Sequence, residues 1–243
     1  MMYAVRHTTR YDYSETVPIC YNRAHLSPRI DRNQSVLNRH IDVTPGSAVF
    51  SGPRTDIFGN EVNYFTVQEP HSSMEVTLHA QVEVLPVEYL DLNLSPKWET
   101  ALVASRETKD INAYQFTFDS KFVAASPVLS AYALPSFPAG RPFLAAVSDL
   151  TARIHRDFTY DPAATTVSTP LDEVMQNRRG VCQDFAHLQI GCLRSLGVPA
   201  RYVSGYLRND DPELHVGRTS HSWAEAWVPG LEWVGFDPAN NIS

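Results

Sequence analysis

Apolar and polar residues alternate along the first third of the chain, which is the pattern of half-buried β-strands. The clearest run, residues 74–86, places Met, Val, Leu, Ala, Val and Val at every second position and stops at Pro86. The runs 3–14 and 19–29 are also rich in strand-forming residues, and Gly59-Asn60 separates two β-prone segments, as in a hairpin turn. We therefore predict a β-rich domain over residues 1–90.

The pattern changes after residue 90. Residues 91–141 contain several prolines and show weak periodicity, so we expect a connecting region with short helices. From Pro142 onward the apolar residues recur at three- and four-residue steps, which predicts an amphipathic helix. Its buried face would carry Leu144, Val147, Leu150, Ile154 and Phe158.

Two further helices are expected next. Thr169 is a candidate N-cap with Pro170 at the first helical position, and Gly180 is a candidate C′ residue after Arg179. A second helix begins near Cys182 and ends at Gly197. Its apolar stripe comprises Phe185, Leu188, Cys192, Leu193 and Leu196.

Three strand-like segments close the chain, at residues 200–207, 221–228 and 231–238. Helices followed by strands predict an α+β core over residues 142–243, in which the helices pack on an antiparallel sheet.

Composition and charge narrow the classes of function. The chain has 243 residues, is 43% hydrophobic and 19% charged, and carries a formal net charge of −7. This charge argues against a nucleic-acid partner, because phosphate binding needs a basic face. The sequence shows no apolar run long enough to span a bilayer and no secretory signal at its start. We expect a cytoplasmic protein without a membrane partner.

The three cysteines are Cys20, Cys182 and Cys192. On one helix, Cys182 and Cys192 would lie roughly 15 Å apart, which is too far for a disulfide. Cys192 falls on the apolar stripe and is expected in the core. Cys182 falls at the helix start, where free N–H groups and the helix dipole stabilise a thiolate. Cys182 is therefore the candidate nucleophile.

A nucleophilic cysteine needs a base, and the base needs a residue that orients it. The strands on either side of Pro229-Gly230 form a predicted hairpin. A three-residue loop at 228–230 would pair His221 with Asp237. His221 is the candidate base and Asp237 the candidate orienting acid.

Other chemistries find less support in the sequence. A zinc site could recruit Cys182, His187, His215 and His221, but no CxxC or HxxxH pair fixes two ligands. The histidines of the first domain are scattered and are expected to be exposed or hydrogen-bonded strand residues instead of ligands; they are His7, His25, His40, His71 and His79. Phosphate-loop, dinucleotide and G-x-S-x-G motifs are missing from the sequence. We predict no metal and no cofactor.

The segments "RRGVCQDFAHLQIGCLRSLGVPARYVSGY" and "SHSWAEAWVPGLEWVGFDPANN" resemble the bacterial transglutaminase-like superfamily, which has a papain-like cysteine-protease core. The motifs "YDYSETV", "LSPR" and "DIFGN" resemble the β-rich N-terminal region often joined to such cores. In that family the matching cysteine, histidine and aspartate form a catalytic triad, which implies this role for Cys182, His221 and Asp237. Family members usually continue further after the aspartate, so the resemblance implies either a shortened core or one that closes differently.

The resemblance implies acyl transfer from a peptide or amide substrate through a thioester. The thioester is resolved by water in a peptidase or amidase, which we favour, or by an amine in a transglutaminase. A non-catalytic protein-binding module is the remaining alternative. We expect the Cys182 backbone N–H to hold the oxyanion, with Tyr160 as a candidate second donor unless it is merely a packed aromatic. Trp223, on the same strand face as His221, is a candidate substrate contact.

Overall fold

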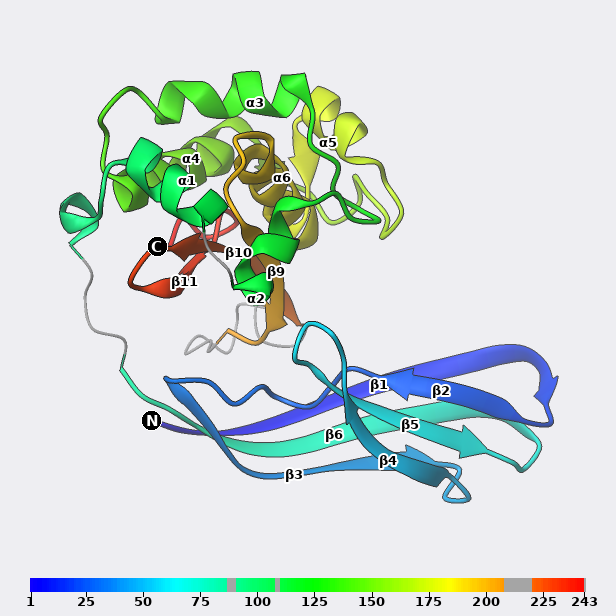
Figure 1. Cartoon of the computed structure of the whole chain (residues 1–243). Coiled ribbons are helices and arrows are strands. Elements are labelled where there is room, and N and C mark those ends of the chain that lie inside the picture. The colour runs from blue at the N-terminus through cyan, green and yellow to red at the C-terminus, as the bar shows by residue number, and fades with distance from the viewer. Residues whose placement is uncertain (87–90, 108–109, 208–219, 243) are drawn as a thin grey trace. The chain divides into compact units, whose positions relative to one another are not determined.

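The computed structural model has an α+β fold, as the sequence predicts (Figure 1). It describes residues 1–86, 91–107, 110–207 and 220–242. The chain divides into two compact units, Met1–Tyr89 and Leu90–Ser243. Among the described residues, none of the helices combines the length and apolar character needed to cross a bilayer.

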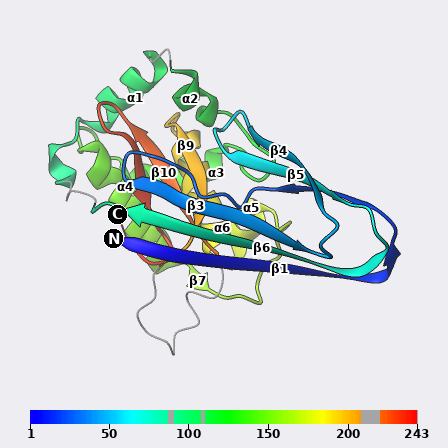
Figure 2. The ribbon, with the colours of Figure 1, turned by 90° about the horizontal axis from the view of Figure 1, so that it is seen from below.

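The N-terminal unit consists of two three-stranded antiparallel sheets. The first sheet has the order β1 (Met2–Val17), β6 (His71–Val84) and β3 (Gln34–Thr44), which lie side by side in Figure 2. The second has the order β2 (Cys20–Ala24), β5 (Glu61–Val67) and β4 (Val49–Thr55).

The two sheets share a small apolar core. Phe65 and Val67 of β5 pack with Met74 and Val76 of β6, which leaves the other face of each strand to solvent. The predicted hairpin is confirmed, because Gly59 takes a φ of 80° in the turn between β4 and β5. Few side chains tolerate that φ, and glycine does so without strain.

The second unit contains the helices and a smaller sheet. Its helical elements are η1 (Leu92–Leu94), α1 (Trp98–Glu107), α2 (Ile111–Tyr114), η2 (Gln115–Thr117), α3 (Pro127–Ala133), η3 (Leu134–Ser136), α4 (Phe143–Asp157), α5 (Leu171–Asn177) and α6 (Cys182–Ser195). Its antiparallel sheet has the order β11 (Glu232–Phe236), β10 (His221–Val228) and β9 (Ala200–Gly205). A short parallel pair joins β7 (Thr159–Tyr160) to β8 (Arg179–Gly180).

One apolar core holds this unit together. The face of α4 predicted from its periodicity is buried, and α6 contributes the predicted Phe185, Leu188, Cys192 and Leu193. Residues expected in the connecting region share the same core, among them Leu129 and Phe137. Residues 91–141 therefore belong to the same compact unit as the helices and sheet that follow them.

The predictions for both ends of α5 were wrong. Pro170 is the N-cap instead of Thr169, and the helix closes on Arg178, which takes the left-handed conformation with a φ of 54°. Gly180 instead forms part of β8. The guanidinium of Arg178 lies over the rings of Tyr132 and Phe158, at 5.1 and 4.7 Å from their centroids. These distant contacts stabilise a conformation that local sequence would assign to glycine.

The predicted register of the β10–β11 hairpin was also wrong, by two residues. The structure pairs Val228 with Glu232 and Trp227 with Trp233, so the three-residue loop covers 229–231. The predicted loop was one residue earlier. Because a shift of two residues keeps every side chain on the same face, the predicted faces are unchanged.

Candidate active site

Cys182 is the first residue of α6, as the sequence predicts. The Asp184 carboxylate caps this helix start, accepting hydrogen bonds from the Val181 N–H at 2.8 Å and the Thr165 hydroxyl at 2.6 Å. A Cβ on Gly180 would lie 2.7 Å from Asp184 Oδ2, so only glycine leaves room for the cap. The sequence around Cys182 thus fixes the helix start that exposes it to unpaired N–H groups and the positive end of the dipole.

The two cysteines of α6 have opposite electrostatic surroundings. Partial burial tends to raise the pKa of Cys182, but hydrogen bonds with His221 and Ser222 outweigh it and lower that pKa overall. Complete burial raises the pKa of Cys192 to about 12. All three cysteines of the chain are free thiols. At neutral pH, Cys182 therefore has far more thiolate than Cys192.

His221 and Asp237 are in direct contact, as predicted. His221 Nε2 lies 2.8 Å from Asp237 Oδ2, and the two side chains are only 12% and 9% exposed. Continuing the observed register would set Asp237 opposite Trp223, so His221 reaches the carboxylate diagonally across the hairpin. His221 also hydrogen-bonds with the Cys182 side chain, so the imidazole links the carboxylate to the thiol.

The Asp237 carboxylate is held by a tight turn. Its Oδ1 accepts hydrogen bonds from the N–H groups of Ala239 at 2.9 Å and Asn240 at 3.2 Å, and its Oδ2 accepts from Asn240 Nδ2 at 2.7 Å. Two backbone bonds between Asp237 and Ile242 close the turn. Burial tends to raise the pKa of Asp237, but the bonds from His221 and Asn240 hold it below its usual value.

The charges of the site reinforce one another. The hydrogen bond to Asp237, and next that to Cys182, raises the pKa of His221 to about 9. A raised histidine pKa beside a lowered cysteine pKa favours a thiolate–imidazolium pair near neutral pH. The arrangement can therefore supply a nucleophile together with a proton donor.

Tyr160 lies beside Cys182, and the β7–β8 pairing explains why. Tyr160 pairs with Gly180, just upstream of the cysteine. Burial raises the pKa of Tyr160, and the charge of Cys182 and a hydrogen bond with its side chain raise it further. The Cys182 backbone also hydrogen-bonds with the tyrosine. The sequence candidate is therefore in place, although a role as oxyanion donor stays a prediction.

Trp223 packs beside the histidine. Its ring lies 6.3 Å from that of His221 at an interplanar angle of 24°. A Cβ on Gly205 would lie 2.6 Å from Trp223 Cη2, and Gly235 is also in contact with the indole. Two glycines on flanking strands thus make room for Trp223, which packs against His221. Its predicted contact with substrate stays a prediction.

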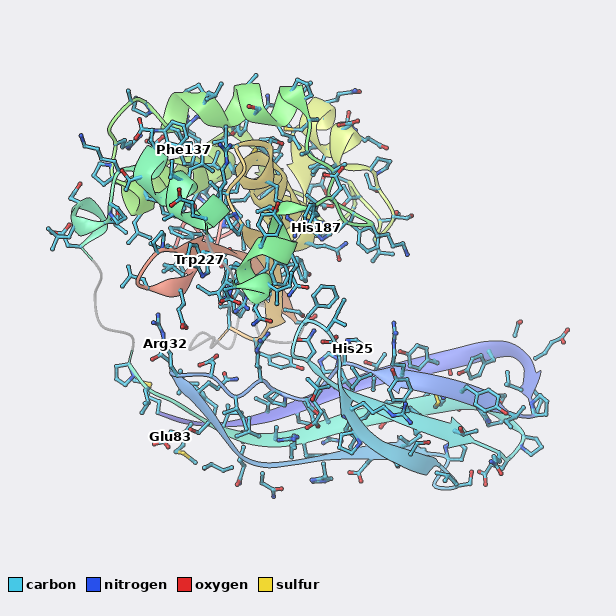
Figure 3. All side chains as sticks on the ribbon, viewed as in Figure 1. His25, Arg32, Glu83, Phe137, His187 and Trp227 are labelled. Atoms are coloured by element: carbon cyan, nitrogen blue, oxygen red, sulfur yellow. The ribbon has the colours of Figure 1, made fainter. Side chains whose placement is uncertain are left out.

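Sequence reasoning missed Asn240 and a groove along α6. The groove has a volume of about 410 Å³. His187 of α6, labelled in Figure 3, lies on its wall with Phe122 and Tyr202, at 5.6 and 5.1 Å from their ring centroids. Further lining residues are Ser120, Val123, Val167, Gln183, Ile190 and Arg194. Only the spacing of Gln183, His187, Ile190 and Arg194 on one helix face could have indicated it.

The alternative zinc site is not assembled by the described residues. His187 contacts aromatic rings, and Cys182, His187 and His221 do not gather as a group at ligand distances. The fourth candidate, His215, lies outside the described residues.

Comparisons with known proteins identify the family of this chain. Residues 138–238 match the model of the Transglutaminase-like superfamily, and residues 3–83 match that of the Bacterial transglutaminase-like N-terminal region. The protein "Uncharacterized protein Rv2569c" of Mycobacterium tuberculosis is 38% identical over 250 residues, covering 98% of this chain and 79% of its own length.

Two further relatives carry functional names. A protein-glutamine gamma-glutamyltransferase of Pseudomonas aeruginosa is 30% identical over 106 residues, which cover 39% of this chain and 16% of that protein. A crystal structure from Cytophaga hutchinsonii, described as a "Putative Cysteine Protease", has a TM-score of 0.77 at 20% identity. It covers 100% of this chain and 80% of its own, and at that identity the likeness shows the fold. Both family models match in order along the chain, and Cys182, His221 and Asp237 all lie within residues 138–238. This chain therefore belongs to the transglutaminase-like superfamily.

Proposed function

We propose that this protein is a cysteine peptidase or amidase that hydrolyses an amide bond through a thioester intermediate. The observation that carries the proposal is the hydrogen-bonded series from Asp237 through His221 to Cys182 at the start of α6. Each member has the pKa direction that its role requires, because the acid stays ionised, the imidazole holds a proton and the thiol is acidic.

The proposed reaction has two stages. The Cys182 thiolate attacks the amide carbonyl, and the imidazolium of His221 gives its proton to the departing amine as the carbon–nitrogen bond breaks. The resulting neutral imidazole takes a proton from water, whose oxygen attacks the thioester and releases the carboxylic acid and Cys182. Asp237 keeps the imidazole in the tautomer and orientation that both transfers need.

Charge develops on the carbonyl oxygen in both stages. The Cys182 N–H at the start of α6 is one donor for this oxygen. The Tyr160 hydroxyl is the proposed second donor, because it already hydrogen-bonds with the Cys182 side chain and backbone. Tyr160→Phe should therefore reduce kcat by about 10²-fold or more. The alkylation rate of Cys182 should change much less, since the thiol loses only one of its hydrogen bonds.

The groove beside α6 is the proposed binding site for a substrate side chain. The groove adjoins the nucleophile, because Gln183, the residue after Cys182, lines it together with Tyr202. Burial raises the pKa of Tyr202, and the charge of nearby Cys182 raises it further. Burial lowers the pKa of His187, so this wall carries no imidazolium charge at neutral pH. Aromatic and aliphatic walls of this kind suit an apolar side chain next to the cleaved amide.

Hydrolysis and transfer to an amine proceed through the same thioester, so the geometry of the triad does not distinguish them. The similar proteins are the remaining guide. The structural relative described as a protease spans the whole chain, whereas the glutamyltransferase match spans 39% of it. We therefore favour water as the acceptor, with an amine acceptor as the second candidate.

Loading the enzyme with an activated ester tests both the identity of the nucleophile and the identity of the acceptor. The ester acylates Cys182 without requiring knowledge of the natural amide, and mass spectrometry locates the adduct. Cys182→Ala should not be acylated at this site, while Cys192→Ala should match the parent. Product partitioning between water and a primary amine added at increasing concentration then identifies the acceptor. If amide is the main product at millimolar amine, hydrolysis is overturned in favour of transfer. If Cys182→Ala is acylated as readily as the parent, both proposals are overturned.

A further inference from the structure

The solvent face of the β1-β6-β3 sheet gathers three potential metal ligands. The strand register sets His40 of β3 directly opposite His79 of β6. Asp42 lies two residues beyond His40 and therefore points to the same face of the sheet. All three side chains are accessible, at 57%, 38% and 65% exposure for His40, His79 and Asp42.

The three side chains converge on a small volume. Asp42 Oδ2 lies 3.4 Å from His40 Nε2 and also 3.4 Å from His79 Nε2. The two imidazole rings are nearly parallel, with centroids 4.7 Å apart and an interplanar angle of 5°. One donor atom from each residue can be chosen so that all three lie within 4.8 Å of one another.

These separations match those of a tetrahedral metal site. Zinc binds imidazole nitrogen and carboxylate oxygen at about 2.0–2.2 Å, which places neighbouring ligand atoms about 3.3–3.5 Å apart. Both nitrogen–oxygen distances already have this value. The two imidazole nitrogens have at most 4.8 Å between them, so a modest rotation of exposed side chains brings them to the required spacing.

We propose that His40, Asp42 and His79 form a binding site for a divalent transition-metal ion such as Zn²⁺, with water as the fourth ligand. Two imidazoles and one carboxylate suit zinc, copper or nickel better than calcium or magnesium, which prefer sets of oxygen ligands. The site lies wholly within the N-terminal unit and does not involve Cys182.

The neighbours of the cluster set a limit on its affinity. Arg6 of β1 pairs with His79, and Thr77 pairs with Asp42. The positive charge of Arg6 on the same face opposes a cation, although the high dielectric of the surface weakens this repulsion. Arg6 therefore serves as a matched test position, since removing its charge should favour the metal without removing a ligand.

Cobalt binding tests the proposal in the full chain carrying Cys182→Ala. Co²⁺ should produce visible d–d absorption without the sulfur-to-metal charge-transfer band that a cysteine ligand adds, and Zn²⁺ should displace it. Loss of a residue that only hydrogen-bonds to a metal ligand weakens metal binding by about 10–100-fold. His79→Asn removes a ligand itself, so it should weaken cobalt binding at least about tenfold. Asp42→Asn should do the same, and metal should raise the Tm of the parent but not of these variants.

The control variant Arg6→Gln should bind cobalt at least as tightly as the parent. Affinity in His79→Asn equal to that of the parent would overturn the proposal. So would an equal loss in Arg6→Gln, since the effect would then reflect general damage to the sheet. Metal bound only with a sulfur charge-transfer band would place it at Cys20 instead.

Discussion

Selective alkylation of Cys182 over Cys192 is the most direct test of the site. Both thiols belong to α6, so they serve as an internal comparison. Burial raises the pKa of Cys192 to about 12, whereas the pKa of Cys182 lies below the ordinary cysteine value. The difference exceeds three units, so at neutral pH the thiolate fraction of Cys182 is at least about a thousandfold larger.

Intrinsic reactivity reduces this advantage. A less basic thiolate is a weaker nucleophile, and a Brønsted coefficient of 0.4–0.5 over three units costs about 15–30-fold. Ionisation and nucleophilicity together leave Cys182 at least about 30-fold faster. The complete burial of Cys192 adds a steric barrier, so this ratio is a lower bound.

The assay uses a limiting amount of iodoacetamide with the folded protein at neutral pH, followed by peptide mass spectrometry. His221→Ala should slow the labelling of Cys182 and move its pH midpoint upward, toward that of a free cysteine near 8.5. Labelling of Cys192 should not respond to this substitution. Equal labelling of the two thiols in the folded parent would refute the assignment, as would an unchanged pH midpoint in His221→Ala.

Three further predictions concern the residues around the thiol. Asp237→Asn should lower turnover by about 10⁴-fold, by analogy with serine-protease triads, because the amide favours the wrong tautomer of His221; parent-like turnover would reduce the site to a dyad. The parent kcat/KM should fall as pH rises through about 9, because His221 then loses the proton that the leaving amine needs; a flat profile to pH 10 would contradict this. Gly180→Ala should destabilise the fold by about 1–3 kcal/mol in urea unfolding, because the added Cβ collides with Asp184; an unchanged midpoint would show that the cap is not required.

Local patterns sufficed for much of the site. The stripe and end signals of one helix placed Cys182 at its start, and the structure agrees. The contact between His221 and Asp237 was predicted from a register that proved wrong by two residues. It survived because an even shift preserves the face, and because the histidine reaches a diagonal neighbour.

Features that depend on distant contacts could not be predicted. Arg178 ends α5 in a left-handed conformation, and its guanidinium packs over the rings of Tyr132 and Phe158. These rings are distant in the sequence, so the local pattern does not indicate the contact. Likewise, His40 and His79 looked unrelated in the sequence, and only the pairing of β3 with β6 brings them together. Single-sequence periodicity identifies faces, but it does not say which strands are neighbours.

The turn that holds Asp237 also makes the site observable without a substrate. The Asp237 amide donates to the Ile242 carbonyl at 2.7 Å, and the Ile242 amide donates back at 3.1 Å. Nδ1 of His155, on α4, lies 3.1 Å from the carbonyl oxygen of Ala239 in the same turn. Hydrogen exchange at these two amides therefore reports how often the turn opens and releases the carboxylate. Exchange as slow as that of core amides would mean that the acid is fully positioned before any substrate arrives.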